Sequence, residues 1–216
     1  MIECQGKMKP KIKAVLFDIG GVIIRTDDPA PRERLARCFE LDRKGLDELV
    51  FLNPVAQAAE RGESPEEAVW KYVRDRLGLS PAEMSLFQAE FWGGDRVDLS
   101  MLELLAWLRP GCRTGLLTNS WLRDPLRLFW ERFKLPETQG RSALDAVVSS
   151  AAVGVQKPDP RIYAAALEQL GSRAEETVFV DDFPRNVDAA RALGFEAILF
   201  ESPTQARRDL LFLMDR

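Results

Sequence analysis

The 216-residue sequence contains no histidine. This absence excludes a Ser-His-Asp triad, a Cys-His dyad and an imidazole general base formed within the chain. It also excludes histidine-ligated metal sites. Any chemistry must therefore come from carboxylates, lysine and arginine, hydroxyls, amides and a hard metal ion.

Cysteines and long apolar segments are also scarce. The three cysteines, Cys4, Cys38 and Cys112, lie far apart and form no CxxC pair, which argues against a structural zinc site and favours reduced thiols in the cytoplasm. No apolar run reaches the roughly 18 residues that span a bilayer. The polar segment 1–13 lacks the apolar stretch of a signal peptide, so we expect a short N-terminal arm on a cytoplasmic protein with no membrane partner.

The charge pattern gives no sign of a nucleic-acid partner. The net charge is -4, and the lysines and arginines form no basic stripe that would neutralise phosphates. The length and the 46% hydrophobic content fit one α/β domain with an insert. The sequence leaves the oligomeric state open.

Short apolar runs alternate with helical patterns along most of the chain. Runs this short and this continuously apolar predict strands that are covered on both faces, as in a parallel sheet. The predicted strands are residues 13–18, 113–118, 144–149, 177–181 and 195–200, and the predicted helices are 99–108, 122–133, 160–170, 185–193 and 204–213. The alternation predicts an α/β fold with a three-layer, Rossmann-like core, a parallel sheet of at least five strands and right-handed crossovers.

One segment, from about residue 31 to residue 92, interrupts this alternation. It has almost no β-branched runs but several amphipathic stretches, at 32–40, 46–51, 54–61, 65–77 and 81–92. We expect an inserted α-helical cap over residues 26–93, and a core domain formed by residues 1–25 and 94–216.

Polar side chains stand where the predicted strands end, and ligands bind at the carboxyl ends of parallel strands. These residues are Asp18, Thr118, Asn119, Ser120, Lys157, Asp181 and Asp182. Three acids in one place repel one another unless a cation is bound. Mg²⁺ is a hard, oxygen-seeking dication that meets this need.

Four segments carry a family resemblance: 18–22 (DIGGV), 117–120 (LTNS), 157–159 (KPD) and 180–186 (VDDFPRN). In this order, each at a strand end, they resemble the four motifs of the haloacid dehalogenase superfamily, and the insert resembles its small helical cap. The segment LTNSWL and the Asp181-Asp182…Asn186 spacing are most similar to the phosphatase domain of soluble epoxide hydrolases. Bacterial sugar-1-phosphate phosphatases are also similar. The resemblance extends from about residue 13 to residue 200.

The resemblance implies a magnesium-dependent phosphatase that hydrolyses a small phosphate monoester through an aspartyl-phosphate. Asp18 is then the nucleophile. The implied Mg²⁺ ligands are Asp18, Asp182 and the carbonyl of Gly20. Asp181 would hold a water molecule bound to the metal or would contact the metal ligands without binding the metal. Asn186 would orient the groups around the metal.

The same resemblance implies how the phosphate is bound. Thr118 and Asn119 would donate hydrogen bonds to its oxygens, and Lys157 would stabilise the charge that builds in the transition state. Gly21 would let the backbone approach the phosphate closely.

The sequence departs from the family pattern at Gly20, where most phosphatases of the family place an aspartate that protonates the leaving oxygen. Losing a general acid typically costs a factor of about 10² to 10⁴ in rate. The substrate has a good leaving group, or another acid such as Asp27, Asp28 or Glu60 substitutes, or the protein binds phosphorylated ligands and turns over poorly. We favour the first explanation, which predicts that aryl phosphates are cleaved far faster than alkyl phosphates.

Two other functions remain open. A 2-haloacid dehalogenase would use Asp18 to attack carbon without a metal, but those enzymes generally lack the acid pair Asp181-Asp182. A weakly active or non-catalytic member that binds phosphorylated ligands is suggested by Gly20. The partner expected in the favoured interpretation is a small phosphorylated molecule.

Overall fold

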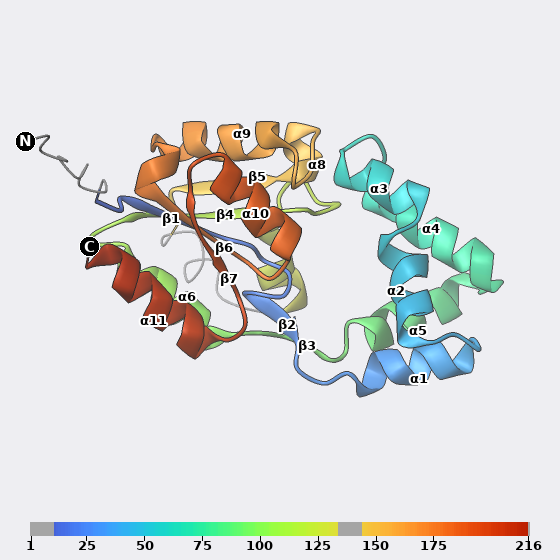
Figure 1. Ribbon diagram of the computed structural model, residues 1–216. Helices are drawn as coiled ribbons and strands as arrows, with labels where there is room; N and C mark the ends of the chain where they lie inside the picture. Colours follow the sequence, from blue (N-terminus) through green and yellow to red (C-terminus); the bar gives the residue numbers. More distant parts are fainter. Residues whose placement is uncertain (1–10, 134–143, 216) are drawn as a thin grey trace, which may run out of the picture.

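The computed structural model describes residues 11–133 and 144–215. Most of the arm expected over residues 1–13 lies outside these ranges. Within them, the core is a five-stranded parallel sheet in the order β5-β4-β1-β6-β7 (Figure 1). The strands are β1 (Ala14–Phe17), β4 (Arg113–Thr118), β5 (Ala146–Ser149), β6 (Thr177–Asp181) and β7 (Glu196–Leu199). All five predicted strands and their parallel arrangement are confirmed.

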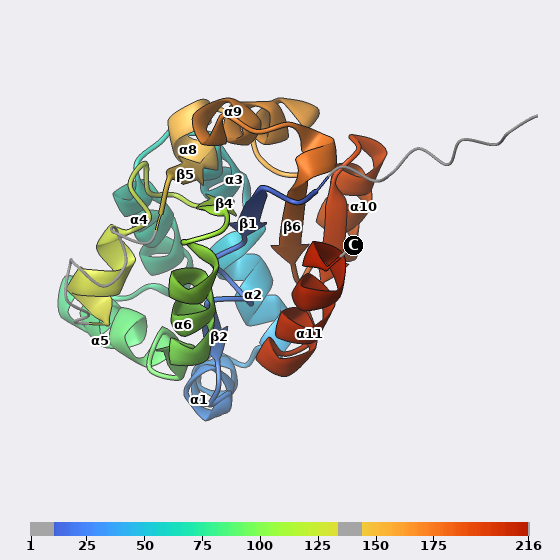
Figure 2. The same ribbon diagram turned by 90° about the vertical axis from the view of Figure 1, so that its left-hand side faces the viewer.

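Helices cover both faces of the sheet, so the core has the three layers expected (Figure 2). Alternate residues of β1 point to opposite faces, as strand geometry requires. Val15 and Phe17 pack with α6 (Leu99–Leu108) and α11 (Pro203–Met214). The other face packs against α9 (Pro160–Leu170) and α10 (Pro184–Ala192). The shorter pieces are α8 (Ser150–Val153) and the 3₁₀ turn η2 (Ala174–Glu176).

The cap consists of helices between β1 and the rest of the sheet. They are α1 (Ala30–Cys38), α2 (Arg43–Phe51), α3 (Pro54–Glu60), α4 (Glu66–Leu77) and α5 (Pro81–Phe91). They share an apolar core of their own, rich in aromatic rings. The chain enters and leaves the cap through a two-stranded antiparallel ribbon, β2 (Ile24–Thr26) and β3 (Asp95–Val97). The domain boundaries at residues 26 and 93 stay a prediction.

Side-chain caps mark where several cap helices begin. Asp42 and Asn53 accept hydrogen bonds from the backbone of the first turns of α2 and α3. Ser80 and Glu83 form a capping box at the start of α5. Such caps satisfy N–H groups that a helix cannot pair internally. They explain why the breaks between the predicted cap helices are close to those observed.

The helix predicted over residues 122–133 is wrong in its first half. Residues 121–126 form bends and turns, and only a short π-helical segment, η1 (Leu128–Arg132), follows. Pro125 has no N–H and disfavours helical backbone at Asp124. The Asp124 carboxylate instead accepts a hydrogen bond from the Leu126 amide at 3.2 Å, which closes a turn.

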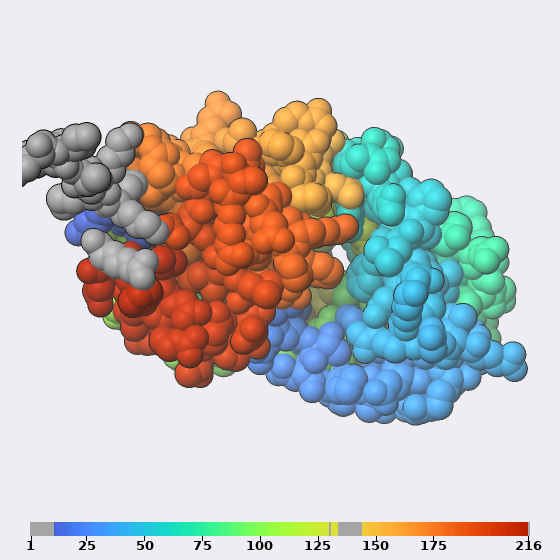
Figure 3. All heavy atoms as spheres, viewed as in Figure 1, coloured from blue at the N-terminus to red at the C-terminus, as the bar shows by residue number. Residues whose placement is uncertain are grey.

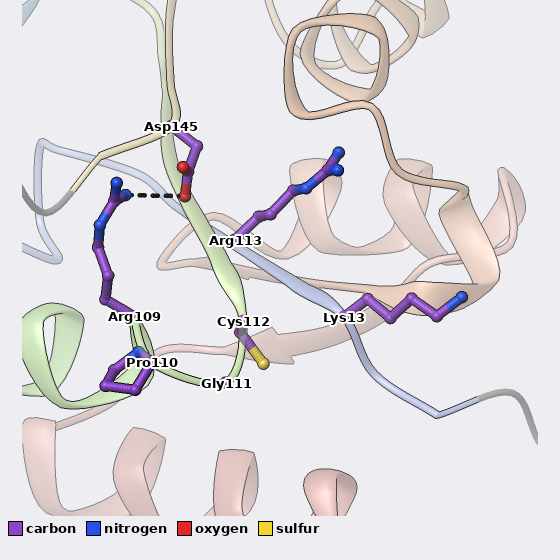
Figure 4. A pocket seen from close by; sticks show the side chains of 7 residues that line it. All are labelled: Lys13, Arg109, Pro110, Gly111, Cys112, Arg113 and Asp145. Atoms are coloured by element: carbon purple, nitrogen blue, oxygen red, sulfur yellow. Dashed lines mark ion pairs between the residues drawn. The ribbon is translucent and has the colours of Figure 1, made fainter.

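A shallow pocket lies at the amino ends of the strands, where Lys13, Arg109, Arg113 and Asp145 gather (Figure 4). Its charges are paired within the chain. Arg109 contacts Asp145 at 2.9 Å, Lys13 contacts Glu176, and Arg113 donates to backbone carbonyls. The pocket is thus at the end of the sheet away from the predicted site. No helix in the described parts of the chain has the length and apolar character needed to cross a membrane.

Candidate active site

Three carboxylates meet at the carboxyl ends of β1 and β6, which face the cap in Figure 1. Asp18 follows β1, Asp181 ends β6, and Asp182 comes next. The two strands are paired, and the Asp18 amide donates to the Val180 carbonyl at 2.9 Å. One oxygen from each of Asp18, Asp181 and Asp182 lies within 4.8 Å of the other two. The structure therefore brings together the three acids that the sequence placed at strand ends.

Lys157 is buried among these acids with 1% of its surface exposed. Its Nζ donates to Asp18 Oδ2 at 2.9 Å, to Asp181 Oδ2 at 2.6 Å and to the Leu117 carbonyl at 3.0 Å. Burial alone would lower the pKa of Lys157, but the charges of Asp18 and Asp181 outweigh it and raise that pKa. Lys157 is therefore a fixed cation beside the predicted nucleophile.

The acids still outnumber the lysine. Burial raises the pKa of Asp18 to about 7, with Lys157 opposing the shift and Asp181 adding to it. Burial and the charge of Asp181 raise the pKa of Asp182 to about 6. A further cation bound here would favour the ionised forms of both groups.

The Asp182 side chain fits a hard metal ion. Its Oδ1 is buried and has no hydrogen-bond partner among the described residues, which is costly for a carboxylate oxygen. Gly21 leaves room for this side chain: its φ is +76°, and a Cβ there would stand 2.0 Å from Asp182 Oδ2. Asp182 thus approaches Gly21 closely, and the approach of phosphate to the Gly21 backbone stays a prediction. Oxygen donors from Asp18 and Asp182 suit Mg²⁺.

Asp181 is held by protein donors on both oxygens. Lys157 Nζ and Asn186 Nδ2 donate to Oδ2, and the Phe183 amide and Asn186 Nδ2 donate to Oδ1, at 2.6 to 3.1 Å. This arrangement favours an orienting role for Asp181 over direct metal ligation. Sequence analysis did not identify Tyr163, whose hydroxyl donates to the Asn186 carbonyl at 2.9 Å. Tyr163 belongs to the apolar stripe of a helix, so its polar contact was hidden.

Thr118 and Asn119 lie where β4 ends. Thr118 is buried, and its hydroxyl is 3.3 Å from the Asn119 carbonyl. The Asn119 side chain bonds the backbone of Lys157 twice, accepting from its amide at 2.8 Å and donating to its carbonyl at 3.2 Å. Asn119 therefore fastens the segment that carries Lys157, and its contact with phosphate stays a prediction.

The acids considered as substitutes at Gly20 differ in their surroundings. Asp27 and Asp28 are exposed; Asp27 is 3.5 Å from Arg25, and Asp28 accepts a hydrogen bond from the Ala30 amide. Glu60 is half-buried at the end of α3, and burial raises its pKa to about 7. The space-filling view shows a cleft between the cap and the core (Figure 3).

Comparison with known proteins gives consistent matches. The sequence pattern of the haloacid dehalogenase-like hydrolases matches residues 12–194. A Mycobacterium tuberculosis protein named phosphatase MT3486 is 35% identical over 91% of this chain and 90% of its own length. A D-ribitol-5-phosphate phosphatase of Bacteroides thetaiotaomicron is 25% identical over 94% of this chain and 99% of its own.

Two further matches extend the comparison. Rat bifunctional epoxide hydrolase 2 is 33% identical over 53% of this chain, which corresponds to 20% of that larger protein. Among solved structures, the enzyme bt-2542 of Bacteroides thetaiotaomicron, in complex with magnesium and inorganic phosphate, has a TM-score of 0.71 and 23% identity. The matched region covers 88% of this chain and 94% of the bt-2542 chain. This likeness establishes the fold.

Proposed function

Because the chain belongs to the haloacid dehalogenase-like hydrolases, we propose that it is a magnesium-dependent phosphatase acting on a small phosphate monoester. The family predicted from the four motifs is confirmed, and with it the prediction that the protein is a hydrolase. The reaction proceeds through an aspartyl-phosphate on Asp18.

The observation that carries the proposal is the contact of Asp18 with Lys157, beside an Asp182 whose buried Oδ1 has no partner in the described parts of the chain. A carboxylate attacks phosphorus with one oxygen, and Asp18 Oδ1 is oriented by the Ile19 amide at 2.7 Å. The charge that builds on the phosphoryl oxygens needs a fixed cation nearby, and Lys157 is held in place by three acceptors.

The metal site is proposed to consist of Asp18, Asp182 and the Gly20 carbonyl. Asp181 and Asn186 would orient these ligands without binding the metal themselves. When bound, Mg²⁺ lessens the repulsion between the carboxylate and the substrate phosphate. The hydroxyl of Thr118, and Asn119, are proposed to donate to the phosphate oxygens.

Three matches support a phosphatase. Two relatives that align with nearly the whole chain are named phosphatases, and the structural neighbour was crystallised with magnesium and phosphate. The acid cluster weighs against a 2-haloacid dehalogenase, because metal-free chemistry leaves Asp182 Oδ1 without a partner.

The test is phosphate release from sugar, polyol, nucleotide and acyl phosphates with and without Mg²⁺. We expect release that needs Mg²⁺ and falls at least about 10³-fold in Asp18→Asn, since no other group replaces a covalent nucleophile. Asp188→Asn is the matched control, because this aspartate is exposed on α10. Chloride release from 2-chloropropionate without metal would instead support the dehalogenase.

A further inference from the structure

We propose that Glu60 is a catalytic residue: from the cap, it protonates the leaving-group oxygen and then activates the attacking water. The inference rests on the proposed phosphatase function and names the residue that performs the role left vacant at Gly20. It replaces the explanation favoured from sequence, in which the substrate needs no acid.

Gly20, two residues after the proposed nucleophile Asp18, has no side chain that could donate a proton. An ideal Cβ built on Gly20 meets nothing within 4 Å, so no neighbouring residue of the described chain occupies the place of a family aspartate. A proton donor must therefore reach the leaving group from elsewhere, and the cap is the part of the chain across the cleft.

Glu60 lies where the cap contacts the core. It is the last residue of α3, which contacts α8 of the core. Two residues on, Gly62 lies so close to Ala151 that a Cβ would stand 2.2 Å from its carbonyl oxygen. This tight packing fixes the end of α3 against the core (Figure 1).

The charges around Glu60 point to the reaction centre. Its strongest electrostatic neighbours are Arg185 and Lys157 of the core, and Arg61 of its own loop. Lys157 is the residue that contacts Asp18. Arg61 is engaged elsewhere, because its Nε and Nη2 each donate to Glu63 at 2.7 Å. Glu60 is thus a half-buried carboxyl group close enough to Lys157 to feel its charge, while Arg61 is held by Glu63.

Burial raises the pKa of Glu60 to about 7 although all three cations oppose the shift. A carboxyl group that titrates near neutral pH can both give a proton and take one back. Glu63 is the opposite case: its partner Arg61 holds the pKa of this exposed carboxyl below its usual value, so Glu63 stays ionised.

The two steps balance as follows. Asp18 bonds to phosphorus while the bond from phosphorus to the substrate oxygen breaks, and that oxygen takes the proton of Glu60 to leave as an alcohol. The Glu60 carboxylate then takes a proton from water as the water oxygen bonds to phosphorus. The Asp18–phosphorus bond breaks, which restores Asp18 and releases inorganic phosphate.

The test compares Glu60→Gln with Glu63→Gln on p-nitrophenyl phosphate and glycerol 1-phosphate. An aryl leaving group needs little protonation, whereas an alkoxide needs much. We expect kcat/KM of Glu60→Gln to fall about 10²-fold on the alkyl substrate and only a few-fold on the aryl one. The wild-type decline in alkyl activity as pH rises through about 7 should disappear in this variant. Glu63→Gln should match the wild type.

Two further measurements separate catalysis from folding. Glu60→Asp keeps an acid and should retain the pH-dependent decline with partial activity. The ionised form of Glu60 destabilises the fold above its raised pKa, so at pH 8 the Tm of Glu60→Gln should be no lower than that of the wild type.

Equal losses on both substrates, or no loss on either, would overturn the role of Glu60. A wild type that releases no phosphate from any substrate would instead overturn the proposed function, so the two failures are distinguishable.

Discussion

At the scale of single residues, Gly21 shows how a backbone conformation serves a neighbouring side chain. Its φ of +76° lies in the region that favours glycine, and the missing Cβ makes room for Asp182. The glycine therefore makes room for a ligand of the proposed metal site although it contributes no side chain.

Gly21→Ala should weaken Mg²⁺ binding and lower activity by at least about 10-fold, because the new methyl group would displace Asp182, the proposed ligand. Changes to residues that only orient a metal ligand already cost about 10- to 100-fold in metal affinity or activity. Gly78→Ala is the control, since Gly78 has a similar φ of +67° but open space around it. It should lose about 1 kcal/mol of stability and no metal affinity. The measurements are Mg²⁺ titration of activity and urea unfolding; equal Mg²⁺ dependence in both variants would contradict the argument.

The strand-end residues of the site were predictable from sequence, whereas Glu60 of the cap was named only alongside Asp27 and Asp28 as an acid that could substitute at Gly20. Asp18 and Asp182 follow apolar runs, and the parallel pairing of β1 with β6 brings them together. Lys157 belongs to one of the four family motifs. Glu60 lies 42 positions after Asp18 on a separate helix, so its approach depends on how the cap packs. Trp121 shows the same limit: it follows the LTNS segment directly in sequence, but its ring centroid lies 5.6 Å from that of Phe51 and 5.5 Å from that of Trp70, both in the cap.

At the scale of elements, continuous apolar runs identified the buried strands because both faces of a parallel sheet are covered. The ribbon of β2 and β3 escaped prediction because each strand has three residues and mixed polarity. This ribbon carries the chain into and out of the cap. Asp95 on β3 accepts two hydrogen bonds from Arg32 of α1, at 3.0 and 2.9 Å, and one from Thr26.

The Arg32–Asp95 pair is buried: 6% of the surface of Arg32 and 4% of the surface of Asp95 are exposed. Arg32→Ala should lower the free energy of unfolding by about 3 kcal/mol, because it leaves the Asp95 carboxylate buried and unpaired. Arg34→Ala is the control two residues along the same helix. It breaks the exposed Arg34–Glu90 pair and should change stability by less than about 1 kcal/mol. Urea unfolding followed by tryptophan fluorescence measures both; equal effects would show that the buried pair does not hold the cap.

At the scale of the whole molecule, the acid cluster links stability to pH and to metal. The pKa values of Asp18 and Asp182, about 7 and about 6, lie above the ordinary 3.8. Their contribution to stability is therefore fully present below about pH 4 and is lost as pH rises through about 6 to 7. Glu176, whose pKa is lowered to about 2 by Arg173 and Lys13, titrates below this window.

Without divalent cations, the Tm should thus fall between pH 5.5 and pH 8, because the carboxylates ionise beside one another. Mg²⁺ binds the ionised acids, so it should raise the Tm more at pH 8 than at pH 5.5, by about 5 °C for about 2 kcal/mol of linkage in a chain of this size. Asp182→Asn removes one negative charge and one ligand, and should reduce both the pH dependence and the Mg²⁺ effect. Differential scanning fluorimetry at the two pH values measures these shifts. A Mg²⁺ effect of the same size at both pH values would show that Mg²⁺ does not compete with protons for the carboxylates of this cluster.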